Sequence, residues 1–132
     1  MWKRVRGASG WTLIELTIVI ALMTILSTIA LVGYRTAVTR TREAVLKEDL
    51  FRMRDAIDQF HADQGVYPTA LEELASNDYL RSIPDDPFTN SAETWVTVLA
   101  EVDPSDPLTQ GIYDVRSGSL RTALDGTQYA EW

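Results

Sequence analysis

Residues 11–32 read WTLIELTIVIALMTILSTIALV and contain one charged side chain, that of Glu15. A helix of this length extends over about 33 Å, which is enough to cross a bilayer hydrocarbon core of about 30 Å. The other polar groups are Thr and Ser hydroxyls, which can bond to carbonyls of their own helix and therefore cost little in lipid. A buried core helix seldom stays apolar on every face for so long. The stretch therefore predicts a transmembrane helix.

The charge of Glu15 needs an explanation, because a carboxylate inside a membrane helix costs about 2.5–3.5 kcal/mol on insertion scales. The side chain either reaches the interface or takes a proton, or it has a partner. The ten residues before the span carry Lys3, Arg4 and Arg6 and end in small residues, which is typical of a processed leader. The apolar run follows this leader instead of lying within it. Cleavage after Gly10 would therefore keep the helix and give it a new, positive N-terminus.

The sequence KRVRGASG followed by WTLIEL resembles the class III leader and N-methylation motif of type IV pilins and type II secretion pseudopilins. The resemblance implies that a prepilin peptidase cuts after Gly10 and methylates the new amine of Trp11, where the family usually has Phe. It also implies that Glu15 pairs with the N-terminus of a neighbouring subunit during filament assembly. Two charges that are each costly in lipid offset one another when staggered helices bring them together.

Composition and charge bound the rest of the chain. Its 132 residues, 45% of them hydrophobic, predict one small domain plus an anchor, and without cysteine no disulfide stabilises the fold. The net charge is +2 over residues 1–33, +1 over residues 34–62 and −10 over residues 63–132. The basic leader favours a cytoplasmic N-terminus, although Arg35, Arg40 and Arg42 beyond the span weaken this asymmetry, so the orientation rests partly on the resemblance. The acidic C-terminal part argues against nucleic-acid binding.

Residues 34–62 are predicted to continue the helix with one apolar stripe, whose members recur at spacings of 4, 3, 4 and 3 residues: Leu46, Leu50, Met53, Ile57 and Phe60. Charged residues such as Glu43, Lys47, Arg54 and Asp58 fall off this stripe. We expect the stripe to dock on a small sheet, as in pilin-like folds. The alternative is a coiled-coil seam between protomers, although fewer than three heptads are present.

After the helix, residues 63–132 are predicted to form a globular head. Gly65 and Pro68 end the helix, and a capping box from Thr69 to Glu72 opens a short helix that reaches about Ser76. A loop with apolar anchors follows over residues 79–88. The order of the segments GVYPT, LEEL and IPDDPF resembles the region after the long helix in major pseudopilins, which favours pseudopilin over pilin in general.

Residues 94–99 and 111–115 are rich in β-branched and aromatic side chains and are predicted to be strands, separated by a turn-rich loop at residues 103–107. Residues 120–124 are a candidate third strand. So small a sheet needs the helix stripe to cover one face. The predicted fold is α+β and pilin-like, with a long N-terminal helix packed on a small antiparallel sheet and a short extra helix. Its divisions are a leader (1–10), a transmembrane helix (11–33), an amphipathic helix (34–62) and the head (63–132).

The C-terminal segment is rich in oxygen ligands, which the hard ion Ca²⁺ prefers. In the major pseudopilins that the chain resembles, a calcium ion ties down this loop, where many pilins use a disulfide. The matching positions are Asp114, Ser117 and Asp125, with Ser119 and Thr127 as further donors. Alternatively, the Ser-Gly and Asp-Gly pairs are hairpin turns that need no metal.

No catalytic constellation is predicted. The chain has no cysteine and one histidine, His61, which lies at a helix end, so the usual triads cannot be built. The adjacent carboxylates at residues 72–73 and 85–86 are interpreted as solvated faces and turns. We therefore expect a non-enzyme.

The resemblance implies a structural subunit of a type II secretion pseudopilus, anchored in a bacterial inner membrane by one span with its head in the periplasm. The implied partners are the lipid bilayer, further copies of the chain in a helical polymer, prepilin peptidase, the inner-membrane assembly platform and minor pseudopilins. The alternative is a type IV pilin for adhesion, twitching or DNA uptake. A membrane-anchored binding domain is disfavoured, because an anchor needs neither Glu15 nor the Gly10 junction.

Overall fold

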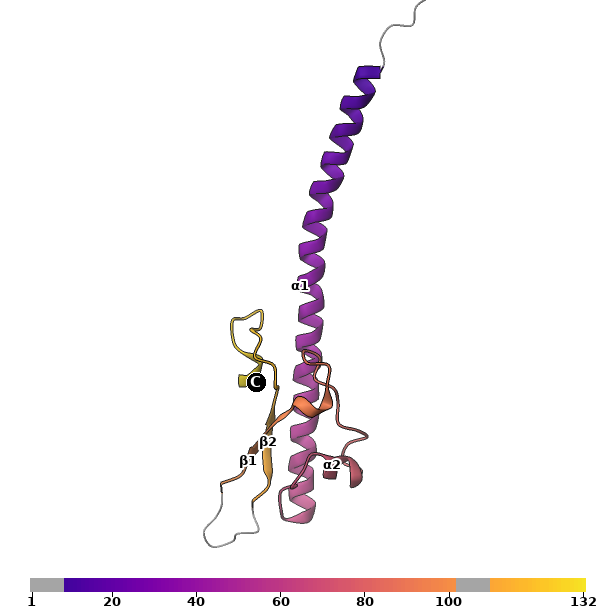
Figure 1. Ribbon diagram of the computed structural model, residues 1–132. Helices are drawn as coiled ribbons and strands as arrows, with labels where there is room; N and C mark the ends of the chain where they lie inside the picture. Colours follow the sequence, from indigo (N-terminus) through magenta and orange to yellow (C-terminus); the bar gives the residue numbers. More distant parts are fainter. Residues whose placement is uncertain (1–8, 102–109) are drawn as a thin grey trace, which may run out of the picture. The chain divides into compact units, whose positions relative to one another are not determined.

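The computed structural model describes residues 9–101 and 110–132 (Figure 1). Its helices and strands, in chain order, are α1 (Ser9–Gln64), α2 (Glu72–Ser76), the 3-10 helix η1 (Ala92–Thr94), β1 (Val96–Leu99), β2 (Ile112–Arg116) and the 3-10 helix η3 (Tyr129–Glu131). A long N-terminal helix with a small antiparallel sheet and a short helix is the α+β, pilin-like arrangement that the sequence predicts. The leader up to residue 8 and the loop at residues 103–107 lie outside the described residues.

The chain divides into two compact units, Met1–Val38 and Thr39–Trp132. In the first unit, every side chain from Trp11 to Arg35 is exposed. By length and composition, α1 is the one helix of the described residues that could cross a membrane, and its most apolar window has a mean hydropathy of 2.4 with no part buried. A surface this apolar is unstable in water, so the first unit needs lipid or other helices around it.

The core of the second unit is built on the apolar stripe of α1, whose five predicted members are all buried. They share one cluster with Trp95 and with Ile112 and Val115 of β2. Partly buried side chains of the loop after α2 pack against this cluster, as expected for apolar anchors: Tyr79, Leu80, Ile83 and Phe88. The chain itself therefore covers the stripe, which does not remain free to form a coiled-coil seam.

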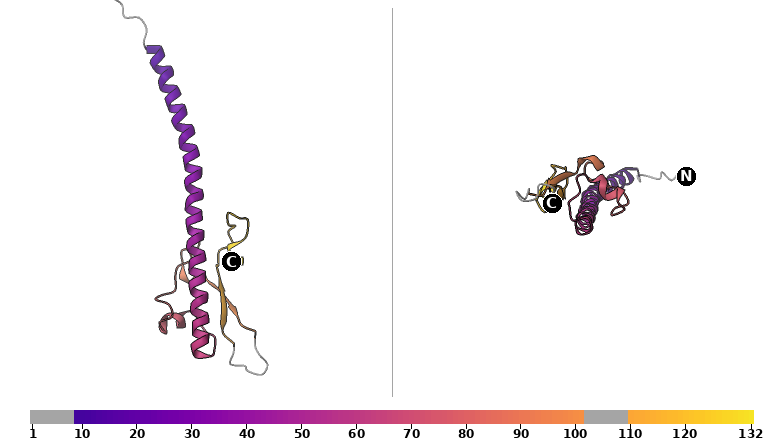
Figure 2. Two further views of the ribbon diagram at one scale, coloured as in Figure 1. Left: turned by 180° about the vertical axis from the view of Figure 1, so that it is seen from behind. Right: turned by 90° about the horizontal axis from the view of Figure 1, so that it is seen from below.

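The sheet has two antiparallel strands, with Val96 opposite Arg116 and Thr97 opposite Val115. It lies along one side of residues 39–64 of α1, and α2 lies on another side (Figures 1 and 2). The first strand begins two residues later than predicted, because η1 occupies the residues before it. The side chain of Ser91 caps η1 by accepting a hydrogen bond from the Glu93 N–H at 3.1 Å.

The candidate third strand at residues 120–124 is wrong. This segment makes only an isolated bridge, between Thr122 and Gln128. Between them the chain turns at Gly126, whose φ is +91°, and the Asp125 carboxylate accepts a hydrogen bond from the Thr127 N–H at 2.9 Å. The Asp-Gly pair therefore folds the segment back on itself, which is the turn that the sequence offered as the alternative to a metal site.

In the connection from α1 to α2, the structure confirms the predicted end of α1 but not the predicted start of α2. Gly65 adopts φ +73° and its N–H donates to the His61 carbonyl at 2.9 Å, which confirms the left-handed cap. The capping box is wrong, because the N-cap of α2 is Leu71, which has no side-chain cap. Leu71 already has helical dihedral angles (φ −63°, ψ −29°), so the chain tightens before α2. The N–H and the hydroxyl of Thr69 therefore donate to the carboxylate of Glu73, four residues later, and not to that of Glu72.

The interpretation of Asp86 as a solvated turn residue is half right. The residue sits in a turn, and its carbonyl accepts from the Asn90 N–H at 2.7 Å, but its side chain is fully buried. One carboxylate oxygen accepts from the Phe88 N–H at 2.8 Å, and the other accepts from the Ser117 hydroxyl. Asp86 therefore joins two distant segments of the head inside the core, whereas its neighbour Asp85 is exposed.

Truncating the stripe should destabilise the second unit. Ile57 is 0% exposed, so Ile57→Ala should lower the free energy of unfolding by about 2–5 kcal/mol through lost burial and the cavity left behind. Val45, on the same helix but 45% exposed, provides the control: Val45→Ala should change it by less than about 0.5 kcal/mol. Urea unfolding of the detergent-solubilised chain measures both, and equal effects would contradict the buried stripe.

Candidate functional site

Glu15 lies on the exposed, apolar part of α1. Trp11 precedes it by one turn on the same helix face and is 77% exposed. The two line a shallow surface hollow of about 310 Å³ together with Ile14, Ile18 and Val19. Within the described part of the chain, the Glu15 carboxylate has no hydrogen-bond or ion-pair partner. The arrangement is an open apolar surface that carries a single unpaired acid.

Several hydroxyls of this segment are satisfied within the helix, as the sequence suggested. Thr17 donates to the Leu13 carbonyl at 2.7 Å, and Thr24 and Thr28 donate to the carbonyls four residues before them at 2.8 Å. These bonds lower the cost of placing the hydroxyls in lipid. The charge of Glu15 therefore dominates the polarity of the segment.

The junction between Gly10 and Trp11 lies in the first turn of α1, which begins at Ser9. The N–H groups of a first turn lack helical partners, and helix ends fray within one or two residues. Gly10 weakens the turn further, since glycine is a poor helix former. This part of the chain can thus take an extended form at little cost.

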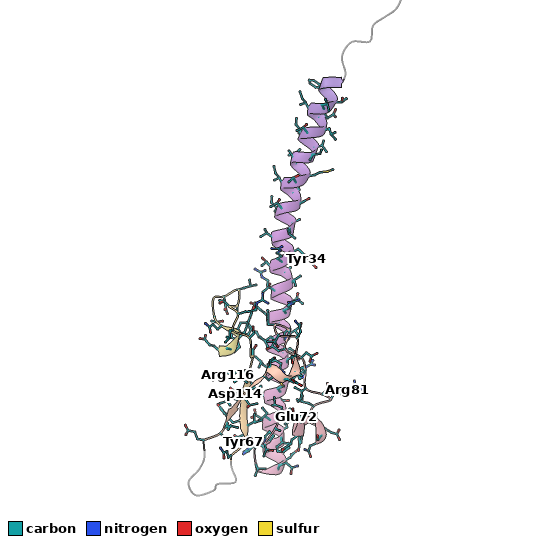
Figure 3. All side chains as sticks on the ribbon, in the orientation of Figure 1. Tyr34, Tyr67, Glu72, Arg81, Asp114 and Arg116 are labelled. Carbon is teal, nitrogen blue, oxygen red and sulfur yellow. The ribbon has the colours of Figure 1, made fainter. Side chains whose placement is uncertain are left out.

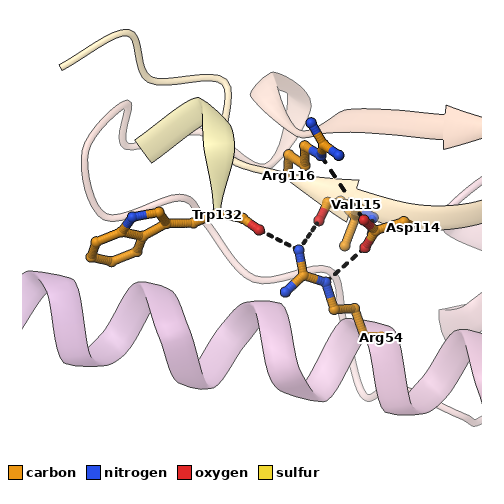
Figure 4. Close-up of polar contacts among 5 residues, drawn as sticks. All are labelled: Arg54, Asp114, Val115, Arg116 and Trp132. Atoms are coloured by element: carbon orange, nitrogen blue, oxygen red, sulfur yellow. Dashed lines mark hydrogen bonds and ion pairs between the residues drawn. The ribbon is translucent and has the colours of Figure 1, made fainter. Parts of the chain in front are cut away.

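A second group of polar residues, which the sequence analysis missed, holds the C-terminal segment on α1. Arg54 donates from Nε to the Asp114 carboxylate at 2.7 Å and from Nη2 to the Val115 carbonyl at 3.0 Å (Figure 4). The same nitrogen also donates to the main-chain oxygen of Trp132. Arg116 approaches the other oxygen of Asp114 at 4.0 Å. One side chain of α1 thus binds both β2 and the end of the described chain.

Glu43 and Lys47 complete this group, which we call the helix clamp (Glu43, Lys47 and Arg54). The Glu43 carboxylate accepts hydrogen bonds from the Leu124 N–H at 2.8 Å and from the Tyr129 hydroxyl at 2.9 Å. The Lys47 ammonium lies 4.3 Å from the centre of the Trp132 ring. The spacings of 4 and 7 residues put the clamp on one line beside the apolar stripe. That spacing is the signal for the clamp in the sequence. By itself it indicates only polar residues that lie off the apolar stripe.

The three residues matched to a calcium loop engage separate partners. Asp114 binds Arg54, the Ser117 hydroxyl donates to Asp86, and Asp125 accepts from Thr127, whose hydrogen bonds lower the pKa of Asp125. Over residues 9–101 and 110–132, no three His, Cys, Asp or Glu side chains gather as metal ligands would. The three side chains are thus held by other groups of the chain, and calcium binding stays a prediction from the sequence.

Comparison with known proteins gives one partial relative. The chain is 38% identical over 68 residues to the fimbrial protein EcpC of Eikenella corrodens, a match that covers 52% of this chain and 43% of that protein. The chain thus matches less than half the length of this relative. Neither a protein-family model nor a solved structure matches the chain. The architecture is therefore pilin-like, and the sequence is similar to part of a fimbrial protein.

We expect the helix clamp to lose most of its stabilising effect when Arg54 is replaced. Its removal takes the guanidinium donors away from Asp114 and from two main-chain oxygens, so Arg54→Ala should lower the free energy of unfolding by about 2 kcal/mol. Arg52 is the matched control, because it forms an ion pair of similar length with Glu48 at 2.8 Å in an exposed position. Arg52→Ala should cost less than about 0.5 kcal/mol in urea unfolding. Equal losses for the two variants would refute the clamp.

Tyr129 makes the free energy of unfolding of the head depend on pH in the alkaline range. Burial, followed by the hydrogen bond to Glu43 and its negative charge, raises the pKa of Tyr129 from 10.0 to about 12. The folded state therefore holds this proton longer than the unfolded state. Its contribution is complete below pH 10 and is lost as the pH rises to about 12, at about 1.4 kcal/mol per pH unit.

The measurement is urea unfolding of the wild type and of Tyr129→Phe across this pH range. The variant keeps the ring, which stacks on Phe88 with 3.9 Å between ring centres, but has no proton to lose. We expect the stability difference between the two proteins to fall as the pH rises. A constant difference would show that Tyr129 titrates alike in both states.

Proposed function

We propose that this chain is a structural subunit of a pilin-type filament, assembled through the N-terminal part of α1. The observation that carries the proposal is the single unpaired carboxylate, Glu15, on an exposed apolar helix. A soluble domain has no use for such a surface, and a simple anchor has no use for the acid. Packing of many such helices against one another accounts for both features.

The assembly step follows from charge. Removal of the leader after Gly10 by a prepilin peptidase leaves an amine on Trp11, which the peptidase methylates and which stays cationic. When a second helix stacks with a stagger, that ammonium meets the carboxylate of Glu15. The pair removes two charges that lipid and the filament core would otherwise tolerate poorly, and it fixes the register between subunits. The role of the chain is then structural and not catalytic.

In its more specific form, the proposal is a pseudopilus of a type II secretion system, with the subunit held in the inner membrane and the head in the periplasm before assembly. The support is the order of the segments GVYPT, LEEL and IPDDPF and the absence of cysteine from the given sequence. By resemblance, the filament would push folded proteins through an outer-membrane pore. Its partners would be further copies of the chain, minor pseudopilins and the assembly platform.

A surface pilus is the second candidate, and the similarity to a fimbrial protein favours it. The two functions differ in where the filament lies. Electron microscopy of intact cells that express the chain at its native level separates them: long surface fibres that carry it support a pilus. Loss of protein export on deletion, without surface fibres, supports a pseudopilus.

Glu15→Ala tests the shared core of both functions. The variant should insert into the membrane as well as the wild type, because it lacks only a costly charge, but it should form no filaments. Filament yield is measured by shearing, immunoblotting and electron microscopy. Thr17→Ala is the control, since the Thr17 hydroxyl bonds only within its own helix at 2.7 Å. A normal filament yield from Glu15→Ala would contradict the proposal.

A further inference from the structure

A groove of about 440 Å³ lies on the head between α2 and the segment that leads from η1 into β1. Its buried residues are apolar, namely Leu71, Trp95 and Ile112. Two exposed carboxylates, those of Glu72 and Glu93, line the same groove. Figure 3 shows Glu72 in the head. The groove therefore has a mostly polar accessible lining with an acidic rim, and the three apolar side chains lie buried beneath it.

The two carboxylates of the rim are not used within the chain. Neither has a hydrogen-bond or ion-pair partner in the part that the structure describes, whereas the neighbouring Glu73 is held by Thr69. A guanidinium group suits such a groove. Its several N–H donors can reach two carboxylates, and they suit a mostly polar lining.

The chain offers an arginine of its own for this place. Most basic side chains of the second unit already have partners within it: Lys47, Arg52, Arg54, Arg116 and Arg121. Arg40 is exposed and, like Arg42 and Arg81, has no partner for its guanidinium among the described residues. It lies about a third of a turn away from the line of the buried stripe. Phe51, which is 67% exposed, follows three turns later on the same face.

Arg40 makes no ion pair with the groove of its own molecule, since neither Glu72 nor Glu93 has one among the described residues. The Ile112 side of the groove lies beside the C-terminal end of α1, because the Ile112 N–H donates to the Pro68 carbonyl at 2.7 Å and the adjacent Tyr67 stacks on His61 with 4.1 Å between ring centres. Arg40 and His61 are separated by about 32 Å along the helix axis. A second molecule, shifted along the helix, can bring its Arg40 to this groove.

We propose that Arg40 of one copy enters the groove of a second copy and pairs with its Glu72 and Glu93. The inference rests on the proposed filament, since it needs copies of the chain side by side. Charge favours this pairing: residues 63–132 carry a net charge of −10, so heads repel one another, whereas residues 34–62 carry six basic and five acidic side chains, a net charge of +1. An arginine from the helix of one subunit against the acidic head of the next converts repulsion into attraction and selects one docking geometry.

Charge reversal in the full-length chain gives the first test. Arg40→Glu should lower the yield of sheared filaments by at least about fivefold, because it replaces an attraction by a repulsion. Adding Glu72→Arg and Glu93→Arg to the same chain reverses the contact everywhere in the filament and should restore most of the yield. Arg81→Glu is the matched control, with the same change of charge at an exposed position of the head, and should leave the yield unchanged (Figure 3).

The absence of cysteine allows a second test without background. A chain with Arg40→Cys and Glu93→Cys, treated with a short bismaleimide in the assembled state, should give a ladder of cross-linked multimers. Replacing Glu93→Cys by Glu131→Cys, at an exposed site outside the groove, should give none. Each single-cysteine chain should give no ladder either.

The outcomes separate this inference from the filament proposal. If wild-type chains form no filaments, the filament proposal fails. If Glu15→Ala abolishes filaments but Arg40→Glu leaves their yield intact, or if the ladder forms with Glu131→Cys and not with Glu93→Cys, the groove contact alone is wrong. Weaker membrane binding of Arg40→Glu with normal filaments would assign Arg40 to anionic lipid headgroups and would also overturn the contact. Three results together would support the groove contact. Arg40→Glu lowers the filament yield, the added Glu72→Arg and Glu93→Arg restore it, and the cross-linked ladder forms with Glu93→Cys but not with Glu131→Cys.

Discussion

A two-stranded sheet does not persist in water unless something covers one of its faces, and in this protein the cover is the apolar stripe of α1. Leu46, Met53 and Ile57 of the stripe are fully buried in the same cluster as Val115 of β2. The helix therefore does more than connect an apolar N-terminal segment to a head. Six of the thirteen buried hydrophobic residues in the described part of the chain belong to it, so the head cannot fold without the C-terminal half of α1.

The clamp adds specificity to this packing. Apolar contacts alone would tolerate small shifts of the sheet along the helix, whereas Arg54 and Glu43 bind particular main-chain groups of the C-terminal segment. The clamp also occupies Asp114, which a metal ion would otherwise need. In a chain without cysteine, the hydrogen bonds of the clamp fasten the end of the head to the helix, as a disulfide or a metal ion would in other proteins.

The elements that could be predicted from the sequence are those with a strong local signal. The stripe follows from spacing, the cap at Gly65 follows from the conformational freedom of glycine, and the two strands follow from β-branched runs. The misses depend on tertiary contacts that no local pattern encodes. Asp86 looks like a turn residue and is buried because Ser117, thirty-one positions away, donates to it. The segment at residues 120–124 has the length of a short strand, but the turn at Gly126 folds it back on itself.

The candidate assembly residues, Gly10, Trp11 and Glu15, come from a motif, and the structure adds that the helix is exposed and apolar at Trp11 and Glu15. The measurement that tests the account most directly is the intact mass of the protein extracted from membranes of cells with an active prepilin peptidase. The account predicts a species that begins at Trp11 and carries one additional methyl group. A full-length species that still begins at Met1 would contradict it, because without a free amine at Trp11 the carboxylate of Glu15 has no partner in a filament.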